Sequence, residues 1–375
     1  MRIRPILTVL AMCGLLAGAV LRCSLAPLPP GPQVIATRVG FARGAVLALP
    51  PGRAIDRAAL FASLKEAQLT TVILRVSADE TGARVEENVS LAIELQRELD
   101  SDVLIGTYLR DARAEPTSID AMLAVDRTFV GCYSGDGPRL ESTDPTIDKL
   151  RLCSADVSRR IVAVLAARGA SDRIGCHVPD VPELVDLPTD DVRARIAQFH
   201  REAARPCTDA KRPVSMSPLL TRRTLDPERA GTELRESLTD AGVDVYMLQD
   251  GVNADPMQSG RAAPFYQGLR NATVDRVPVQ IWANVEAFDC ESPSCTKTHP
   301  TSKARLIGQL CAARSRVNGI VITEYAHHFA GRPVLLGDLP DASPEERAIA
   351  DDIDAAAVLR KDYLEWRDAG GPCGP

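Results

Sequence analysis

The sequence lacks several features that mark whole classes of protein. Basic residues are not in excess, since 44 Lys and Arg stand against 50 Asp and Glu, giving a formal net charge of -6. A nucleic-acid-binding surface needs a basic patch, so this balance argues against such a partner. No low-complexity tract or long block of like charge interrupts the chain. Hydrophobic residues make up 45% of the 375 positions, enough for the core of one large domain or two ordinary ones.

Metal-binding signatures are also missing. No two cysteines stand in C-x-x-C spacing, which disfavours a structural zinc site. The adjacent histidines His327 and His328 fall on a predicted strand, where neighbouring side chains point in opposite directions, so they are not expected to share a metal. A metal-dependent hydrolase would need a His/Asp cluster on the first strands, and VGFARGAV contains none. We therefore expect no metal and no cofactor.

The N-terminus is typical of a targeting segment. Residues 1–25 combine Arg2 and Arg4 with an apolar run over residues 6–21 and an A-x-A-like cleavage motif. The run is short for a transmembrane span, although an uncleaved anchor followed by the Pro-rich linker 26–37 is the alternative. We predict export to the periplasm or the cell exterior, with membrane contact only through this segment.

Export gives the cysteines an explanation. Two of the ten, Cys13 and Cys23, fall in the leader, which leaves eight for the domain. An even number in an exported protein favours disulfides over metal binding, although the pairing cannot be read from the sequence. Cys290 and Cys295, joined by the short CESPSC loop, are the easiest local pair to propose.

The chain after the linker alternates between strand-like and helix-like segments. Strand patterns occur near residues 40, 72, 105, 175, 215, 246, 281 and 321. Strict β/α alternation predicts a parallel sheet, and this number of units predicts a closed (β/α)8 TIM barrel over residues 38–375, ending in a C-terminal helix. An open doubly wound sheet is the alternative, but no G-x-G-x-x-G turn follows the first strand.

Polar and aromatic residues stand where these strands end. Active sites of TIM barrels lie at the carboxyl ends of the strands, so these positions are the site candidates. They are Arg75; Tyr108 and Asp111; His177, Asp180 and Glu183; Ser215 and Ser217; Gln249 and Asp250; Trp282, Asn284 and Glu286; and Glu324 and Tyr325. The fourth and seventh strands each end in a carboxylate, the arrangement that many retaining glycosidases use.

The stretch VPVQIWANVEAFDCE, residues 277–291, is the most informative of these strand ends. A strand has a side-chain period of two, so Trp282, Asn284 and Glu286 are predicted to share one side. An indole, an amide and a carboxylate together suit a sugar pocket. The structural alternative is that Trp282 is packing and Glu286 is the first residue of a loop.

Four segments, GCHVPDVPE, PVSMSPLLT, VDVYMLQDGVN and VQIWANVEAF, resemble in order and spacing a bacterial barrel family called domain of unknown function 4434. The resemblance spans roughly residues 38–330. It implies a glycosidase-like TIM barrel acting on a poly- or oligosaccharide. The family typically carries glutamate in the fourth-strand motif where this chain has Asp180, whose carboxyl is one methylene shorter.

These observations assign roles to the strand-end residues. Glu286 is the nucleophile or charge stabiliser, and Asp180 the general acid/base, with Glu183 as its substitute. The predicted substrate-binding residues are Gln249 and Asp250, for sugar hydroxyls; Trp282 and Tyr108, for stacking; and Asn284, Arg75, His177 and Tyr325, for further polar contacts. Asp250 before glycine could instead cap a turn, and Arg75 could be an ion-pair partner. A catalytically inactive carbohydrate-binding barrel in envelope polysaccharide handling is the alternative function.

Overall fold

The structure is a computed structural model, and it describes the chain in segments between residues 41 and 373. The described residues are 41–49, 54–77, 82–108, 146–181, 190–218, 242–249, 259–273, 279–290, 298–331, 334–336 and 353–373. The predicted leader and linker, residues 1–37, lie outside them, as do Asp111, Glu183, Asp250 and Cys295. The boundaries predicted for the leader and for the domain remain predictions.

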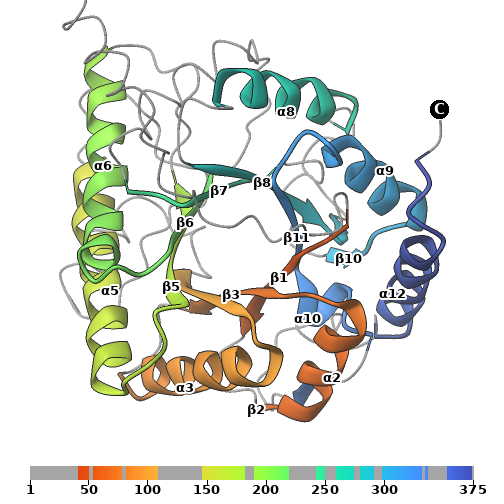
Figure 1. The fold of residues 1–375 in the computed structure, drawn as a ribbon, viewed down its shortest axis with the longest axis horizontal. Coiled ribbons are helices and arrows are strands. Elements are labelled where there is room, and N and C mark those ends of the chain that lie inside the picture. The colour runs from red at the N-terminus through yellow and green to blue at the C-terminus, as the bar shows by residue number, and fades with distance from the viewer. Residues whose placement is uncertain are drawn as a thin grey trace, which may run out of the picture. The chain divides into compact units, whose positions relative to one another are not determined.

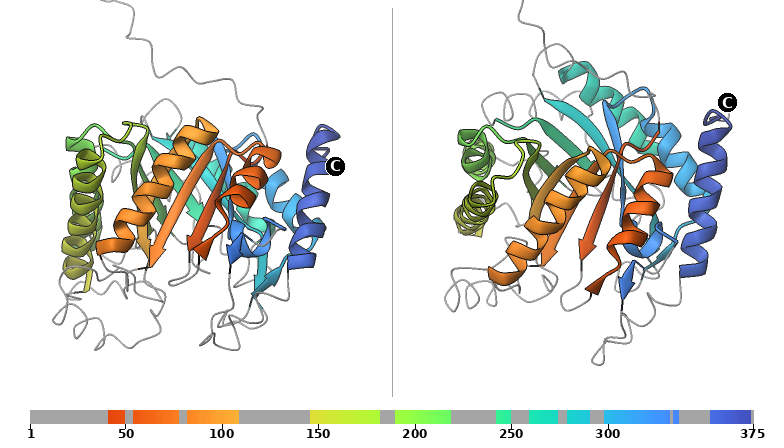
Figure 2. Two further views of the ribbon diagram at one scale, coloured as in Figure 1. Left: turned by 90° about the horizontal axis from the view of Figure 1, so that it is seen from below. Right: turned by 60° about the horizontal axis from the view of Figure 1, so that its bottom comes forward.

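Eight parallel strands close into a barrel (Figure 1). In ring order they are β1 (Gly44–Leu49), β3 (Thr71–Ser77), β4 (Asp102–Tyr108), β5 (Ile174–Val181), β6 (Val214–Pro218), β7 (Val245–Gln249), β8 (Gln280–Glu286) and β11 (Gly319–Thr323). The ring closes where β1 pairs with β11, with Gly44 opposite Val321. Neighbouring strands of the ring are parallel, and those visible in the side view point toward the same end (Figure 2). The TIM barrel predicted from the alternation is therefore confirmed.

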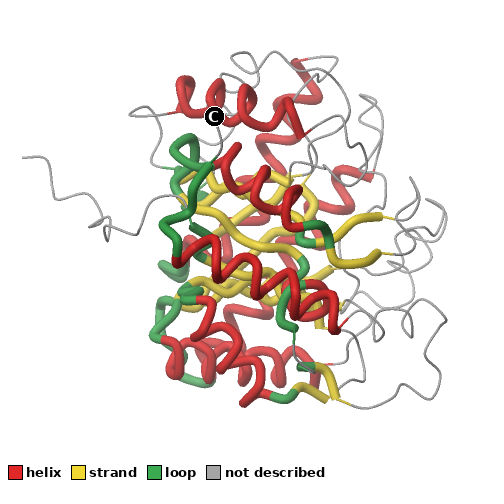
Figure 3. The backbone as a smooth tube through the Cα atoms, turned by 90° about the vertical axis from the view of Figure 1, so that its right-hand side faces the viewer, coloured by secondary structure: helices red, strands yellow, loops and turns green. Residues whose placement is uncertain are grey.

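Helices surround the strands, as the tube view shows (Figure 3). They are α2 (Arg57–Ala67), α3 (Gly82–Leu99), α5 (Thr146–Ala167), α6 (Asp190–Asp209), α8 (Ser259–Thr273), α9 (Lys303–Ala313) and α12 (Ile353–Asp368). Their apolar faces join the outward residues of the strands in one buried cluster, in which Leu60 and Leu64 of α2 share the core with Leu47 of β1. This is the layer that the helical spacing of apolar residues predicts.

Local signals set several helix starts. The Asp56 carboxylate accepts the N–H of Ala59 at 2.9 Å and caps α2. The Ser302 hydroxyl caps α9 in the same way through the N–H of Arg305. The sequence pattern of residues 154–168 predicts a helix capped by Ser154, but α5 already begins at Thr146 and Ser154 lies inside it.

The segment predicted as the last strand is divided. Residues 319–329 were expected to be one strand, but β11 ends at Thr323 and the short helix α10 (Tyr325–His328) follows. The Glu324 carboxylate accepts the N–H groups of Ala326 and His327, so this residue caps a helix instead of extending the strand. Two small antiparallel pairs complete the fold: β9 (Phe288–Cys290) with β10 (Thr298–Pro300), and β2 (Ala54–Ile55) with β12 (Leu335–Leu336).

Two disulfides fasten helices within the described residues. Cys176 of β5 is bonded to Cys207 of α6, and Cys311 of α9 is bonded to Cys373 near the C-terminus. The Cys290 side chain and Cys295 lie outside the description, so the proposed local pair is untested. Within the described ranges, no helix combines the length and the apolar character that a membrane span requires.

Candidate active site

An apolar layer divides the interior of the barrel. Six inward side chains from six strands form it, each no more than 4% exposed: Val46, Ile73, Leu104, Met247, Trp282 and Val321. Buried polar side chains follow toward the carboxyl ends of the strands. They are His177, Ser215, Ser217, Asn284, Glu286 and Thr323. This polar group is the candidate active site, because it lies at the end where TIM barrels carry their chemistry.

Strand β8 supplies residues to both layers. Trp282, Asn284 and Glu286 lie on one side of the strand by its period of two, as predicted, but at different depths. Trp282 belongs to the apolar layer, and its Nε1 donates to Gln280 Oε1 at 2.9 Å. Glu286 is four positions beyond Trp282, a distance of about 13 Å along the strand. The structure therefore places the indole away from the carboxylate that it was expected to assist.

Glu286 is held at the carboxyl end of β8. It is 7% exposed, and its N–H donates to the Gln309 Oε1 of α9 at 3.1 Å. The Arg305 guanidinium lies 3.8 Å from its carboxylate and also pairs with Asp289. The ion pair with Arg305 places a positive charge beside the carboxylate at the end of the strand.

Asn284 and His177 are fixed by neighbouring strands. The Thr323 hydroxyl donates to Asn284 Oδ1, which holds the amide in one orientation inside the barrel. His177 Nδ1 lies 2.8 Å from the Ser215 hydroxyl on the adjacent strand. Both residues are buried, at 3% and 5% exposure, so their polar atoms are oriented before any ligand arrives.

Asp180 lies in an irregular part of β5. The register between β5 and β6 shifts between Pro179 and Val181, so Asp180 is an extra residue at a β-bulge. Bulges occur often beside active sites, where they redirect a side chain. The side chains of Asp180, Tyr108, Arg75 and Gln249 lie outside the description, although their backbones belong to barrel strands.

Tyr325 does not reach this polar group. It begins α10 and is fully buried, and its hydroxyl lies 2.8 Å from the Ser63 hydroxyl of α2. Burial raises the pKa of Tyr325 above its ordinary value. The strand-based prediction that Tyr325 faces the site assumed that β11 continues through residue 325, and the helix start at this residue turns the ring toward α2.

Two residues of the site were not predicted. Arg305 and Thr323 are the partners of Glu286 and Asn284. A signal for Arg305 was present, because the first turn of the helix after the seventh strand must lie near the carboxyl end of the barrel. Thr323 ends the eighth barrel strand, but the larger polar residues that follow it, Glu324 and Tyr325, gave a stronger signal in the sequence.

Three histidines gather beside the site. The pKa of His328 is lowered to about 4, mainly by burial. His327 of α10 and His299 of β10 contribute to the lowering. His328 Nε2 lies 3.0 Å from the Thr298 hydroxyl, and its ring packs on Phe288. Within the described residues, no three His, Cys, Asp or Glu side chains are arranged to hold a metal ion.

The closed parallel ring and its surrounding helices define the chain as a TIM barrel. The model of the family described as "Domain of unknown function (DUF4434)" matches residues 183–335 and confirms the predicted resemblance over that range. A solved structure described as GH5_18 from Streptomyces cattleya in complex with GlcNAc has a TM-score of 0.50 and 14% identity, covering 90% of this chain and 83% of that one. One described as ZgEngAGH5_4 in complex with a cellotriose has a TM-score of 0.50 and 12% identity, covering 88% and 98%. No curated protein matches.

Proposed function

We propose that the protein is an exported glycoside hydrolase that cleaves a poly- or oligosaccharide with carboxylates at the ends of its fourth and seventh barrel strands. The observation that carries this proposal is Glu286, a nearly buried carboxylate at the end of the seventh strand, 3.8 Å from the Arg305 guanidinium. Strands β5 and β8 are separated in the ring by β6 and β7, so residues at their ends face each other across the opening.

Each residue has a role in this reaction. Glu286 attacks the anomeric carbon or stabilises its developing positive charge, while Asp180, or Glu183 in its place, protonates the leaving oxygen. The amide of Asn284 and the imidazole of His177, both fixed by neighbouring hydroxyls, are suited to bind sugar hydroxyls. Gln249, Asp250, Tyr108 and Arg75 remain candidates for further contacts.

The solved structures and the disulfides support the choice of substrate and location. The two neighbours with this fold contain GlcNAc and cellotriose, so β-linked glucose and N-acetylglucosamine oligomers are the substrates to test first. The Cys176–Cys207 and Cys311–Cys373 bonds suit an oxidising compartment and therefore export.

The test measures hydrolysis and binding of both oligomer series with the full chain, Glu286→Gln and Glu365→Gln. Glu365 is a matched control, because its side chain on α12 is 58% exposed and far from chemistry in the barrel. We expect Glu286→Gln to lower kcat/KM by roughly 10³-fold or more while sugar binding persists, and Glu365→Gln to be unchanged. Glu286→Ala rescued by azide would identify Glu286 as the nucleophile.

Two outcomes would count against this function. Hydrolysis at the unaltered rate in Glu286→Gln would remove Glu286 from the reaction. Binding of sugar without hydrolysis by any of the three proteins would favour the catalytically inactive carbohydrate-binding barrel.

A further inference from the structure

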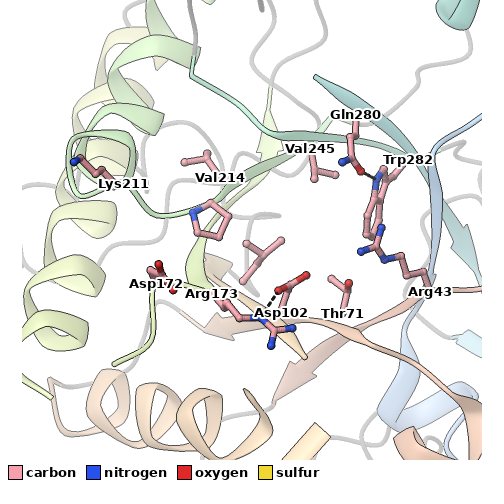
Figure 4. Close-up of a pocket in the computed structure, with 12 residues that line it drawn as sticks. Arg43, Thr71, Asp102, Asp172, Arg173, Lys211, Val214, Val245, Gln280 and Trp282 are labelled. Atoms are coloured by element: carbon pink, nitrogen blue, oxygen red, sulfur yellow. Dashed lines mark hydrogen bonds and ion pairs between the residues drawn. The ribbon is translucent and has the colours of Figure 1, made fainter. Parts of the chain in front are cut away.

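A second polar cavity lies at the opposite end of the barrel, where the strands begin. It has a volume of about 350 Å³ and is lined by Arg43, Thr71, Asp102, Leu104, Asp172, Arg173, Lys211, Pro213, Val214, Val245, Gln280 and Trp282 (Figure 4). Its inner wall contains Thr71, Leu104 and Trp282, which are at most 4% exposed, and its rim contains the exposed Asp172 and Lys211. A cavity of this size accommodates a small molecule.

Arg43 is held in the cavity, and no acidic side chain among the described residues pairs with it. Its N–H donates to Ile320 O and its carbonyl accepts from Thr70 and Thr71, which fixes its backbone between β11 and β3. The guanidinium stacks on the Trp282 ring, 5.0 Å from the ring centre. Within the described residues Arg43 makes no ion pair, and its buried Nε has no hydrogen-bond partner.

Thr71 contributes a second unsatisfied group to the same cavity. The residue is 2% exposed, and its buried Oγ1 has no hydrogen-bond partner within the described structure. Figure 4 shows its side chain beside that of Arg43, on the neighbouring strand. Buried polar atoms are normally hydrogen-bonded because leaving them unpaired is costly. The two residues that carry these unpaired atoms line the same cavity, which indicates a site for a polar ligand.

The remaining charges define the ligand. Arg173 is neutralised by Asp102, with Arg173 Nε 3.0 Å from Asp102 Oδ1, and by Asp100. Within the described structure the cavity is lined by three basic residues, Arg43, Arg173 and Lys211, and by two acidic ones, Asp102 and Asp172, so its lining carries an excess of one positive charge, while Asp100 pairs with Arg173 from outside the lining. The walls between these groups are the apolar side chains of Leu104, Val214 and Val245.

We propose that this cavity binds a small organic monocarboxylate. The Arg43 guanidinium and the Thr71 hydroxyl hold its carboxylate, and its apolar part lies against Leu104 and Val245. A guanidinium can bind a carboxylate through two parallel hydrogen bonds, and its stacking on Trp282 leaves its donor edge available. One excess positive charge and apolar walls fit a monoanion with a hydrocarbon part better than a multiply charged phosphate. The site is separated from the candidate active site by the apolar layer of the barrel and does not depend on the proposed function.

The two tryptophans give a direct assay. Trp282 lines the cavity, whereas the Trp366 Nε1 donates to Pro372 O elsewhere in the fold, so the two indole N–H signals in an NMR spectrum serve as probe and internal control. The full chain is titrated with sodium benzoate, and with sodium butyrate as a second carboxylate. Benzyl alcohol is the neutral analogue, and inorganic phosphate is the multiply charged one.

We expect benzoate to shift the Trp282 signal alone, with a Kd in the millimolar range, about the affinity that a ligand of this size reaches. Arg43→Gln should weaken binding about tenfold or more, and Thr71→Val severalfold. Arg97→Gln is the control, because this arginine on α3 has a side chain that is 69% exposed and outside the cavity.

Four results would overturn the proposal. They are no shift with either carboxylate, equal binding of benzyl alcohol, equal binding of phosphate, and unchanged benzoate binding in both folded variants. Thr71→Val provides the test if Arg43→Gln does not fold.

Discussion

The two ends of the barrel interior satisfy their polar groups in different ways. At the carboxyl end, Thr323 donates to Asn284, and Ser215 lies within hydrogen-bond distance of His177 on the next strand. At the amino end, the hydroxyl of Thr71 and the Nε of Arg43 have no partner within the described residues. The apolar layer that contains Trp282 lies between them.

The two ends of the barrel interior therefore differ in how far their polar side chains are paired within the protein. At the carboxyl end, Thr323 and Ser215 hold Asn284 and His177 in place, so a ligand would meet two side chains of fixed orientation, whereas Gln309 Nε2 of α9 has no hydrogen-bond partner within the described residues. The groups at the amino end are held by backbone contacts and stacking but lack a counterpart. One barrel can therefore carry two independent small-molecule sites, because the apolar layer prevents them from sharing a ligand.

A substitution in the apolar layer between the two ends should have the largest effect on stability. Trp282→Ala deletes an indole that is 4% exposed and leaves a cavity between the two ends. We expect the free energy of unfolding to fall by about 3–5 kcal/mol, measured by urea denaturation. Val358→Ala is the control on the surface of α12, where the side chain is 61% exposed, and it should change stability by less than about 0.5 kcal/mol. A loss below about 1 kcal/mol in Trp282→Ala would show that the layer does not support the barrel.

Lowering the pH should destabilise the folded protein through His328. Burial lowers the pKa of His328 to about 4, so the unfolded chain, with an ordinary value near 6.5, binds the proton first. The stability that this histidine contributes is complete above pH about 6.5 and is lost as the pH falls toward about 4, by about 2–3 kcal/mol. His327 and His299 contribute to this lowering of the pKa, whereas Glu324 opposes it.

His328→Gln tests this dependence, because glutamine does not titrate and can still reach the Thr298 hydroxyl. Urea denaturation at several pH values between 7 and 4 should give a shallower loss of stability in the variant than in the unaltered protein. Parallel curves for the two proteins would contradict the assignment to His328.

Two isosteric substitutions compare a paired buried hydroxyl with an unpaired one, and their effects should be the smallest. Thr323→Val removes the donor to buried Asn284 and should destabilise the protein by about 1–2 kcal/mol. Thr71→Val removes a buried hydroxyl that has no partner, so stability should be unchanged or slightly higher. Thermal and urea denaturation of the pair measure both effects, and equal losses would show that the two hydroxyls are equally well satisfied.

The fold could be predicted because it follows from patterns that are local in sequence. Apolar spacing changes between strand and helix along the chain, and the strict alternation leaves few ways to bury both faces of the sheet. The apolar pattern failed at one segment, where a local helix cap overrides strand-like composition. At residues 324–329 the capping carboxylate of Glu324 starts a helix in a segment that has strand-like composition.

The candidate site was harder to predict than the fold. The period of two gives the side of a strand on which Trp282 and Glu286 lie, but it does not give their depth in the barrel, which depends on where the strand begins. The bulge at Asp180 arises from strand register and leaves no simple mark in the sequence. The position of Arg305 in the first turn of α9 could be expected from the sequence, but its pairing with Glu286 depends on how that helix packs.

The Cys311–Cys373 bond has a mechanical consequence. The two cysteines are 62 positions apart in sequence, and the segment between them contains β11, which closes the barrel against β1, and α12. Tension applied to the chain beyond Cys373 passes directly to α9 through the sulfur atoms and bypasses the intervening segment. The strand that closes the ring is therefore shielded from any pulling force that enters at this end, including that of an unfolding protease.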